Sequence, residues 1–181
     1  GITAVCAAWI SQSITFLALP AAMLIGLLLG TVNGLLYVKC RIPSFVVTLS
    51  TLMVLRGLTI FISGGGSVSV PFSLYDWDNT PLKLAIVVLV ILTAGFIFNY
   101  TKFGKWCKAI GSGVTAAYQS GVPVGKMRIA GYAISAMMCG LCGFFNMVRA
   151  GSAATNTGNF FETDVLIALV LGGMPLSGGS S

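Results

Sequence analysis

Long stretches of this chain carry no charged residue, and these stretches predict helices that cross a membrane. Residues 1–38 are uncharged, and a single helix of that length would reach about 57 Å, far more than a hydrocarbon core of about 30 Å. We therefore expect this run to turn back once, between residues 11 and 20, and to resume as a helix over about 16–38. The remaining predicted helices lie at 43–63, 82–100 and 129–148, with a further one starting near 165.

The loops between the predicted spans differ in charge, and this difference predicts how the chain is oriented. The loops 39–43 and 101–128 hold seven of the ten basic residues, whereas 64–81 holds two of the four acidic ones. Lys and Arg stay preferentially on the cytoplasmic side of short loops. We therefore place 39–43 and 101–128 in the cytoplasm, and 64–81 and 150–162 outside.

The composition supports the same class of protein. Of the 181 residues, 56% are hydrophobic and only 8% are charged, which is too few to cover a water-soluble globule. The net charge of +6 reflects scarce acids rather than abundant bases, so a nucleic-acid partner is not expected. The predicted fold is an all-α integral membrane protein, a polytopic bundle of about four complete transmembrane helices with partial helices at both ends. We expect residues 1–181 to be one transmembrane domain within a longer chain.

Catalytic chemistry has little support in the sequence. The chain has no histidine, and its five cysteines follow no metal-ligand spacing, so no metal, cofactor or enzymatic activity is expected. Glu162 and Asp164 precede an apolar run, where they are expected to cap a helix and complement its dipole. A site with paired carboxylates would need a base or a metal nearby, and the surrounding residues supply neither.

Small residues recur at the spacing of a helix face in two of the predicted spans. Gly26, Gly30 and Gly34 repeat every four residues, and a second small-residue stripe that includes Gly140 runs along 129–148. Membrane helices associate through close backbone approach at such stripes. These four glycines are therefore predicted to pack helices together.

Polar side chains within the predicted spans are candidates for the translocation pathway or its gate. They are Asn33, Thr48, Arg56 and Asn146. A charge near the bilayer centre costs roughly 2.5–3.5 kcal/mol on insertion scales, so Arg56 either lines an aqueous cavity or gate, or extends its stem toward the outer interface. Asn33 and Asn146 either line the pathway or form hydrogen bonds between helices.

The loop 101–128 is far longer than a turn between two spans requires. Residues 115–119 are predicted to form a short helix that ends before Gly121, and the adjacent Ala116 and Ala117 would offer a shallow knob to the groove of a partner. The alternative is a basic loop that rests on anionic lipid headgroups.

Three segments, 26–65, 103–132 and 160–179, resemble the permease subunit of ribose- and galactose-type ABC sugar importers. Branched-chain amino-acid permeases are more distant members of the same superfamily. The resemblance implies a multi-pass protein of the bacterial cytoplasmic (inner) membrane that pairs with a second permease copy, identical or related. It also implies an ABC ATPase dimer, which would hydrolyse ATP on a separate subunit, and a periplasmic or lipoprotein solute-binding protein. On this likeness, the loop residues that couple to the ATPase are Ala116, Ala117, Ser120 and Gly121.

The function expected from this resemblance is import of a small polar solute, a monosaccharide such as ribose, galactose or xylose. A branched-chain amino-acid permease and a permease for a furanosyl signal molecule are the alternatives within the same class. A secondary transporter or channel is the alternative from another class, and it would require ionisable residues inside the spans. Only Arg56 is clearly placed there, which disfavours coupling to protons.

Overall fold

A computed structural model describes residues 2–13, 17–40, 42–71, 80–154 and 161–172. The predicted fold class is confirmed, because these residues are overwhelmingly helical and four of the helices are long and apolar enough to cross a membrane. In order, the helices are α1 (Ile2–Ser13), α2 (Ala18–Cys40), α3 (Ser44–Ser63), α4 (Thr80–Tyr100), α5 (Lys102–Ser112), α6 (Val114–Gln119), α7 (Val124–Ala150) and α8 (Phe161–Leu171). Two short strands complete the described elements, β1 (Val68–Ser69) and β2 (Ser152–Ala153).

The helix boundaries differ from the predicted ones by a few residues. Pro20, the expected break, lies in the first turn of α2, where a proline is tolerated because its missing N–H has no helical partner. α7 begins at Val124 rather than near 129, directly after Pro123. α8 begins at Phe161, so that Glu162 and Asp164 lie inside its first turn instead of ahead of it.

The chain forms two compact units. The first contains residues 1–83 and 128–158, and the second contains residues 84–127 and 159–181. The long helix α7 begins in the second unit and continues through the first.

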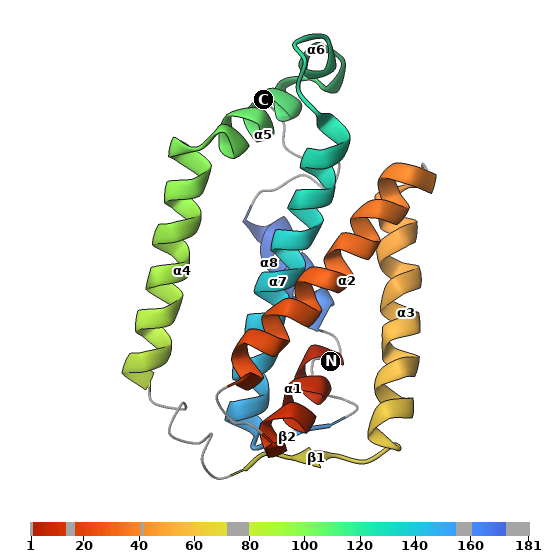
Figure 1. Cartoon of the computed structure of the whole chain (residues 1–181), viewed down its shortest axis with the longest axis vertical. Helices are drawn as coiled ribbons and strands as arrows, with labels where there is room; N and C mark the ends of the chain where they lie inside the picture. The colour runs from red at the N-terminus through yellow and green to blue at the C-terminus, as the bar shows by residue number, and fades with distance from the viewer. Residues whose placement is uncertain (1, 14–16, 41, 72–79, 155–160, 173–181) are drawn as a thin grey trace. The chain divides into compact units, whose positions relative to one another are not determined.

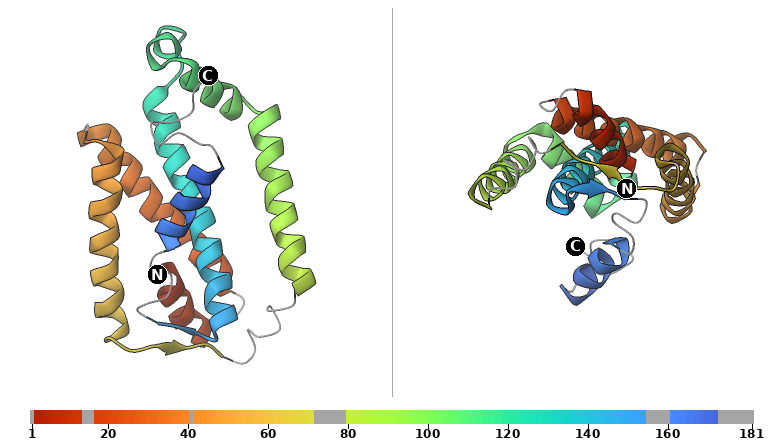
Figure 2. Two further views of the ribbon diagram at one scale, coloured as in Figure 1. Left: turned by 180° about the vertical axis from the view of Figure 1, so that it is seen from behind. Right: turned by 90° about the horizontal axis from the view of Figure 1, so that it is seen from below.

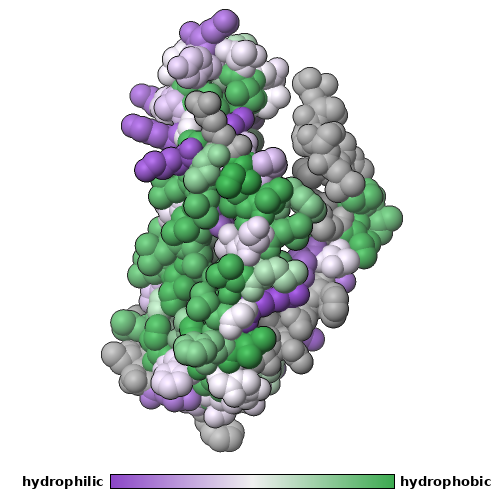
Figure 3. Space-filling model, turned by 90° about the vertical axis from the view of Figure 1, so that its right-hand side faces the viewer, coloured by the Kyte–Doolittle hydropathy of each residue, from purple (hydrophilic) through white to green (hydrophobic). Residues whose placement is uncertain are grey.

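In the first unit, α2 crosses α7 obliquely, as the front and back views show (Figures 1 and 2). α1 packs beside them in a core made mainly of small residues. The core members are Ala4, Val5, Ala7, Ala8, Ala18, Ala22, Val70, Phe144, Met147, Val148 and Ala153. The side of the molecule on which α3 lies is covered largely by hydrophobic side chains (Figure 3), as expected for a surface that faces lipid.

A small antiparallel ribbon joins the ends of α3 and α7. Val68 pairs with Ala153 and Ser69 with Ser152, and the N–H of Val70 donates to the carbonyl of Gly151 at 3.2 Å. α3 ends at Gly64, whose φ of 60° is left-handed, and this turn leads the chain into the ribbon. The ribbon therefore ties together two loops that lie far apart in the sequence.

In the second unit, α5 follows α4 after a single residue, Thr101. The helix α5 was not predicted from the sequence, whereas α6 covers the short helix expected at 115–119. α5 and α6 share a small apolar cluster with the start of α7. Its buried members are Ala117, Val122, Val124 and Met127, and Phe103, Cys107, Ala109 and Ile110 pack against them.

Candidate functional site

The two alanines proposed for coupling point in opposite directions. Ala117 is only 2% exposed and belongs to the apolar cluster beneath α6, whereas Ala116 is exposed. Tyr118 is exposed beside it, at 75%. A partner can therefore touch Ala116 and Tyr118 but not Ala117, whose side chain holds α6 in place.

Ser120 and Gly121 form the end of α6. The hydroxyl of Ser120 donates to the carbonyl of Ala116 at 2.9 Å, and its backbone N–H donates to the same carbonyl at 3.0 Å. Gly121 has a φ of 77°, a left-handed conformation that favours glycine. The next N–H, of Val122, then reaches back to Ala117 at 3.1 Å. These two residues thus close the α6 turn, and both are exposed.

The helix α5 gives this element a basic flank. Lys102, Lys105 and Lys108 are exposed, and no acidic residue occurs anywhere between residues 84 and 127. On the opposite face, burial raises the pKa of the Cys107 thiol, which keeps that side of the helix neutral.

One pair of polar residues inside the spans is brought together. The hydroxyl of Thr51 on α3 donates to the side-chain oxygen of Asn33 on α2 at 2.7 Å. Thr48 instead bonds within its own helix, donating to the carbonyl of Ser44 at 3.0 Å. Arg56 is half-buried on α3, and Asn146 is exposed near the end of α7. The structure therefore connects α2 to α3 through Asn33, and it does not gather the four candidates into one cluster.

The predicted glycine stripes meet at the crossing of α2 and α7. A Cβ added to Gly30 would lie 2.6 Å from the Cβ of Ala136 and would clash with the carbonyl oxygen of Tyr132. Gly26 and Gly140 likewise abut backbone carbonyls of the opposite helix, and a Cβ on Gly34 would lie 2.8 Å from the Cα of Ile129. Backbone meets backbone here, which leaves no room for a methyl group.

An aromatic cluster at the lysine-bearing end of α2 was not predicted. The Tyr37 and Tyr132 ring centroids lie 5.7 Å apart, and the Arg128 guanidinium lies 5.3 Å from the Tyr37 centroid. Cation–π contacts of this kind are worth about 0.5–1 kcal/mol at exposed sites. The sequence does contain a signal for this contact with α7, because Tyr37 follows Gly34 by three residues and so lies on the helix face that the glycines form.

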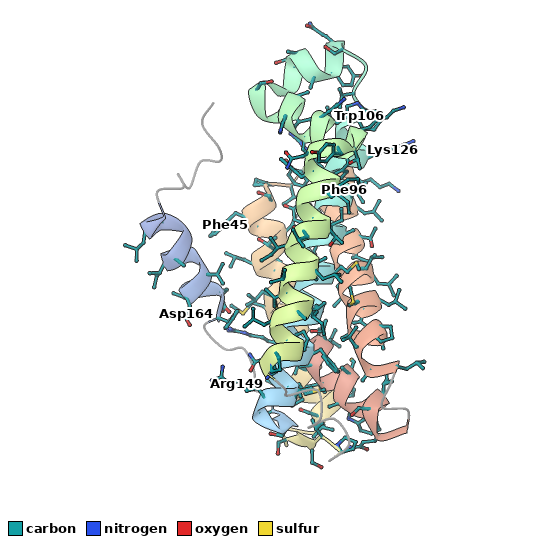
Figure 4. The ribbon with its side chains drawn as sticks, turned by 90° about the vertical axis from the view of Figure 1, so that its left-hand side faces the viewer. Phe45, Phe96, Trp106, Lys126, Arg149 and Asp164 are labelled. Atoms are coloured by element: carbon teal, nitrogen blue, oxygen red, sulfur yellow. The ribbon has the colours of Figure 1, made fainter. Side chains whose placement is uncertain are left out.

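Among the described residues, no group of three or more His, Cys, Asp or Glu side chains is placed to hold a metal ion. Glu162 and Asp164 lie in the first turn of α8, where their charges complement the helix dipole. Arg149 lies in the last turn of α7, where its positive charge complements the negative end of the helix dipole (Figure 4).

Comparison with known proteins adds a family. The profile of the family described as branched-chain amino acid transport system / permease component matches residues 1–180. The ribose import permease protein RbsC of Escherichia coli (strain K12) is 31% identical over 172 residues, covering 90% of this chain and 54% of the relative. RbsC of Haemophilus influenzae is 32% identical over 174 residues, covering 91% of this chain and 54% of the relative.

A relative with a different named cargo is also similar. The autoinducer 2 import system permease protein LsrC of Yersinia pestis (strain Pestoides F) is 33% identical over 166 residues, covering 88% of this chain and 47% of the relative. The chain thus spans about half the length of the curated relatives it matches. No solved structure matches it.

Proposed function

Because this chain belongs to the family of branched-chain amino acid transport system permease components, we propose that it is part of the permease subunit of an ABC importer. Its solute is a small polar molecule, a monosaccharide of the ribose type. The observation that carries this proposal is the similarity to ribose import permeases along 90% of the chain. Residues 1–181 then form part of one transmembrane permease domain in a bacterial inner membrane.

A furanosyl signal molecule is the second candidate solute. The 33% identity to the autoinducer 2 permease is as high as the identity to the ribose permeases, so sequence similarity favours neither cargo over the other. The match to the family profile keeps a branched-chain amino acid as a more distant alternative. The solute-binding protein that delivers the cargo would make the choice.

The proposed partners are an ABC ATPase dimer, a solute-binding protein and a second permease copy. Residues 101–128 act as the coupling segment, and Ala116 and Tyr118 contribute to its contact surface, because both side chains are exposed on α6. ATP hydrolysis takes place on the ATPase, and the permease performs no covalent chemistry.

The structure offers a path by which movement of α6 reaches the spans. α7 begins at Val124, five residues after Gln119, the last residue of α6, and it runs without a break to Ala150. Its glycine-packed crossing with α2 leaves no space for the two helices to slide independently. A displacement that reaches the part of α7 at this crossing would therefore carry α2 with it, as alternation between outward and inward openings requires.

Transport assays test this proposal directly. The full-length permease is reconstituted in vesicles with its cognate ATPase and binding protein, and uptake of radiolabelled ribose is measured. We expect uptake to require ATP on the ATPase side and to persist when an ionophore removes the proton gradient. Uptake that needs the gradient and not ATP would refute the importer and favour a secondary transporter. Uptake of autoinducer 2 in place of ribose would change the proposed solute and leave the assignment to an ABC importer intact.

A further inference from the structure

The helix α5 has two faces with different roles, and only one of them is used inside the protein. Phe103, Cys107 and Ile110 recur at helical spacing and pack against the apolar cluster beneath α6. Lys102, Lys105 and Lys108 lie outside this cluster and are exposed. The lysines therefore contribute nothing to the core of the element, and their surface is available for another molecule.

The depth of α5 follows from its contacts with α4. The Gly104 backbone lies against the carbonyl of Phe98, so closely that a Cβ could not be accommodated, and the Lys108 ammonium lies 5.6 Å from the centroid of the Phe98 ring. Phe98 belongs to the candidate membrane span Lys83–Tyr100. α5 consequently bends sharply at the end of that span and stays against its last turn through Gly104 and Lys108, instead of continuing along the direction of α4 (Figure 1).

Aromatic side chains mark the same level. Tyr100, the last residue of the span, is 76% exposed, and Trp106 on α5 is 36% exposed. Trp106 lies beyond Phe96 along the direction of α4 (Figure 4). Tyr and Trp are enriched at the membrane–water interface, where an apolar ring and a polar tip are both satisfied. Both residues therefore place α5 at the depth of the lipid headgroups.

The charge at this level is entirely positive. Residues 84–127 include four lysines and no acidic residue, and Lys108 contacts an aromatic ring rather than a carboxylate. Three exposed cations at headgroup depth attract an anionic surface, and each contributes about 1 kcal/mol of attraction to anionic lipid, or about fivefold in affinity.

From this depth and charge, we propose that α5 is a binding site for anionic phospholipid, in which Lys102, Lys105 and Lys108 contact the phosphate groups of the adjacent leaflet. An acidic protein surface would satisfy the same charges, but the backbone contact with Phe98 holds the lysines beside the span, where lipid is the neighbour. The bound lipid would hold α5 in position, and α5 packs against α6 through the apolar cluster. The proposal depends on neither the solute nor the ATPase.

Quenching of Trp106 fluorescence by brominated lipid tests the proposal. In the full-length permease, Trp9, Trp77 and any tryptophan outside residues 1–181 are replaced by Phe, so that Trp106 is the one remaining tryptophan, and the protein is reconstituted without any partner subunit. Brominated phosphatidylglycerol is compared with brominated phosphatidylcholine at low ionic strength. We expect phosphatidylglycerol to be preferred by at least tenfold, and the preference to fall as salt screens the charges.

Two charge variants provide the matched comparison. K102Q/K105Q/K108Q should lose the preference, whereas K102R/K105R/K108R should keep it, because arginine retains the charge at the same positions. Circular dichroism and unchanged quenching by brominated phosphatidylcholine verify that α5 remains folded and in place. Two results would overturn the proposal. One is equal quenching by the two lipids in the protein that retains the three lysines, and the other is a preference for phosphatidylglycerol that survives in K102Q/K105Q/K108Q.

Discussion

The α2–α7 crossing and the α5–α6 element are held together in opposite ways. α2 and α7 meet through Gly26, Gly30 and Gly140, so that backbone lies on backbone and only the methyl group of Ala136 faces Gly30. α5 and α6 meet through side chains, with Ala117 and Met127 buried among the residues of a small apolar cluster. The first contact therefore fails when atoms are added, and the second fails when the cluster is made polar or is emptied.

On the proposed function, this difference separates the helices that would move together from the element that a partner would recognise. A glycine-packed crossing has a single close fit, and van der Waals contact over its whole length resists sliding. The α5–α6 element needs only enough apolar burial to hold Ala116 and Tyr118 outward. The two contacts should accordingly respond differently to the same kind of substitution.

Replacing each alanine of the proposed coupling pair by aspartate should produce the largest contrast. Ala117→Asp places a carboxylate in the apolar cluster, which should cost about 3 kcal/mol of local stability, the scale found when a buried charge has no partner. Hydrogen exchange of residues 102–123 should become much faster. Ala116→Asp points to the surface and should leave this exchange unchanged.

The two variants also separate folding from coupling. In the reconstituted importer, Ala116→Asp should abolish stimulation of the ATPase by the permease while the complex stays assembled. If uptake and ATPase stimulation persist in an intact complex, α6 is not the coupling contact. Equal exchange rates in the two variants would instead refute the opposite orientation of the two side chains.

Adding one methyl group to the α2–α7 crossing should have the next largest effect. Gly30→Ala forces the new Cβ against Ala136 and the carbonyl of Tyr132, and overpacking of this kind costs about 1–3 kcal/mol. Gly131→Ala is the matched control on α7, because a Cβ there meets nothing within 4 Å. Unfolding in detergent micelles measures both. Equal stability of the two variants would contradict the close crossing.

The sequence predicts most of this crossing but not the element beyond it. Gly26, Gly30 and Gly34 stand out because small residues at every fourth position are a local, periodic signal. Helix α5 has a periodic signal as well, with apolar residues on one face and three lysines on the other. The segment is short, however, and Gly104 and Gly111 lie within it, so the sequence alone favours a loop there. The structure explains Gly104 by the approach of the Phe98 carbonyl.

The orientation of the alanine pair could not be predicted for a related reason. Ala116 and Ala117 are identical in chemistry, and a helix of six residues is too short for periodicity to identify its buried face. Their orientation depends on Val122 and Met127, which return to the cluster only after the turn at Gly121. Likewise, the sequence marks Asn33 as polar within a span, but only tertiary structure identifies Thr51 as its partner.

Removing the hydrogen bond between Asn33 and Thr51 should have the smallest effect on stability. The loss should be specific to the contact between α2 and α3. Thr51→Val removes the donor at 2.7 Å, and hydrogen bonds between membrane helices average about 0.6 kcal/mol, with a maximum of about 1.7. Thr48→Val is the matched control on the same helix, since its hydroxyl bonds only to carbonyls of α3. Unfolding in detergent should therefore show a loss for Thr51→Val alone, and combining it with Asn33→Leu should add less than the sum of the two single losses. Fully additive losses would mean that Asn33 and Thr51 act independently, and Asn33 would then be better explained as a residue that lines the pathway.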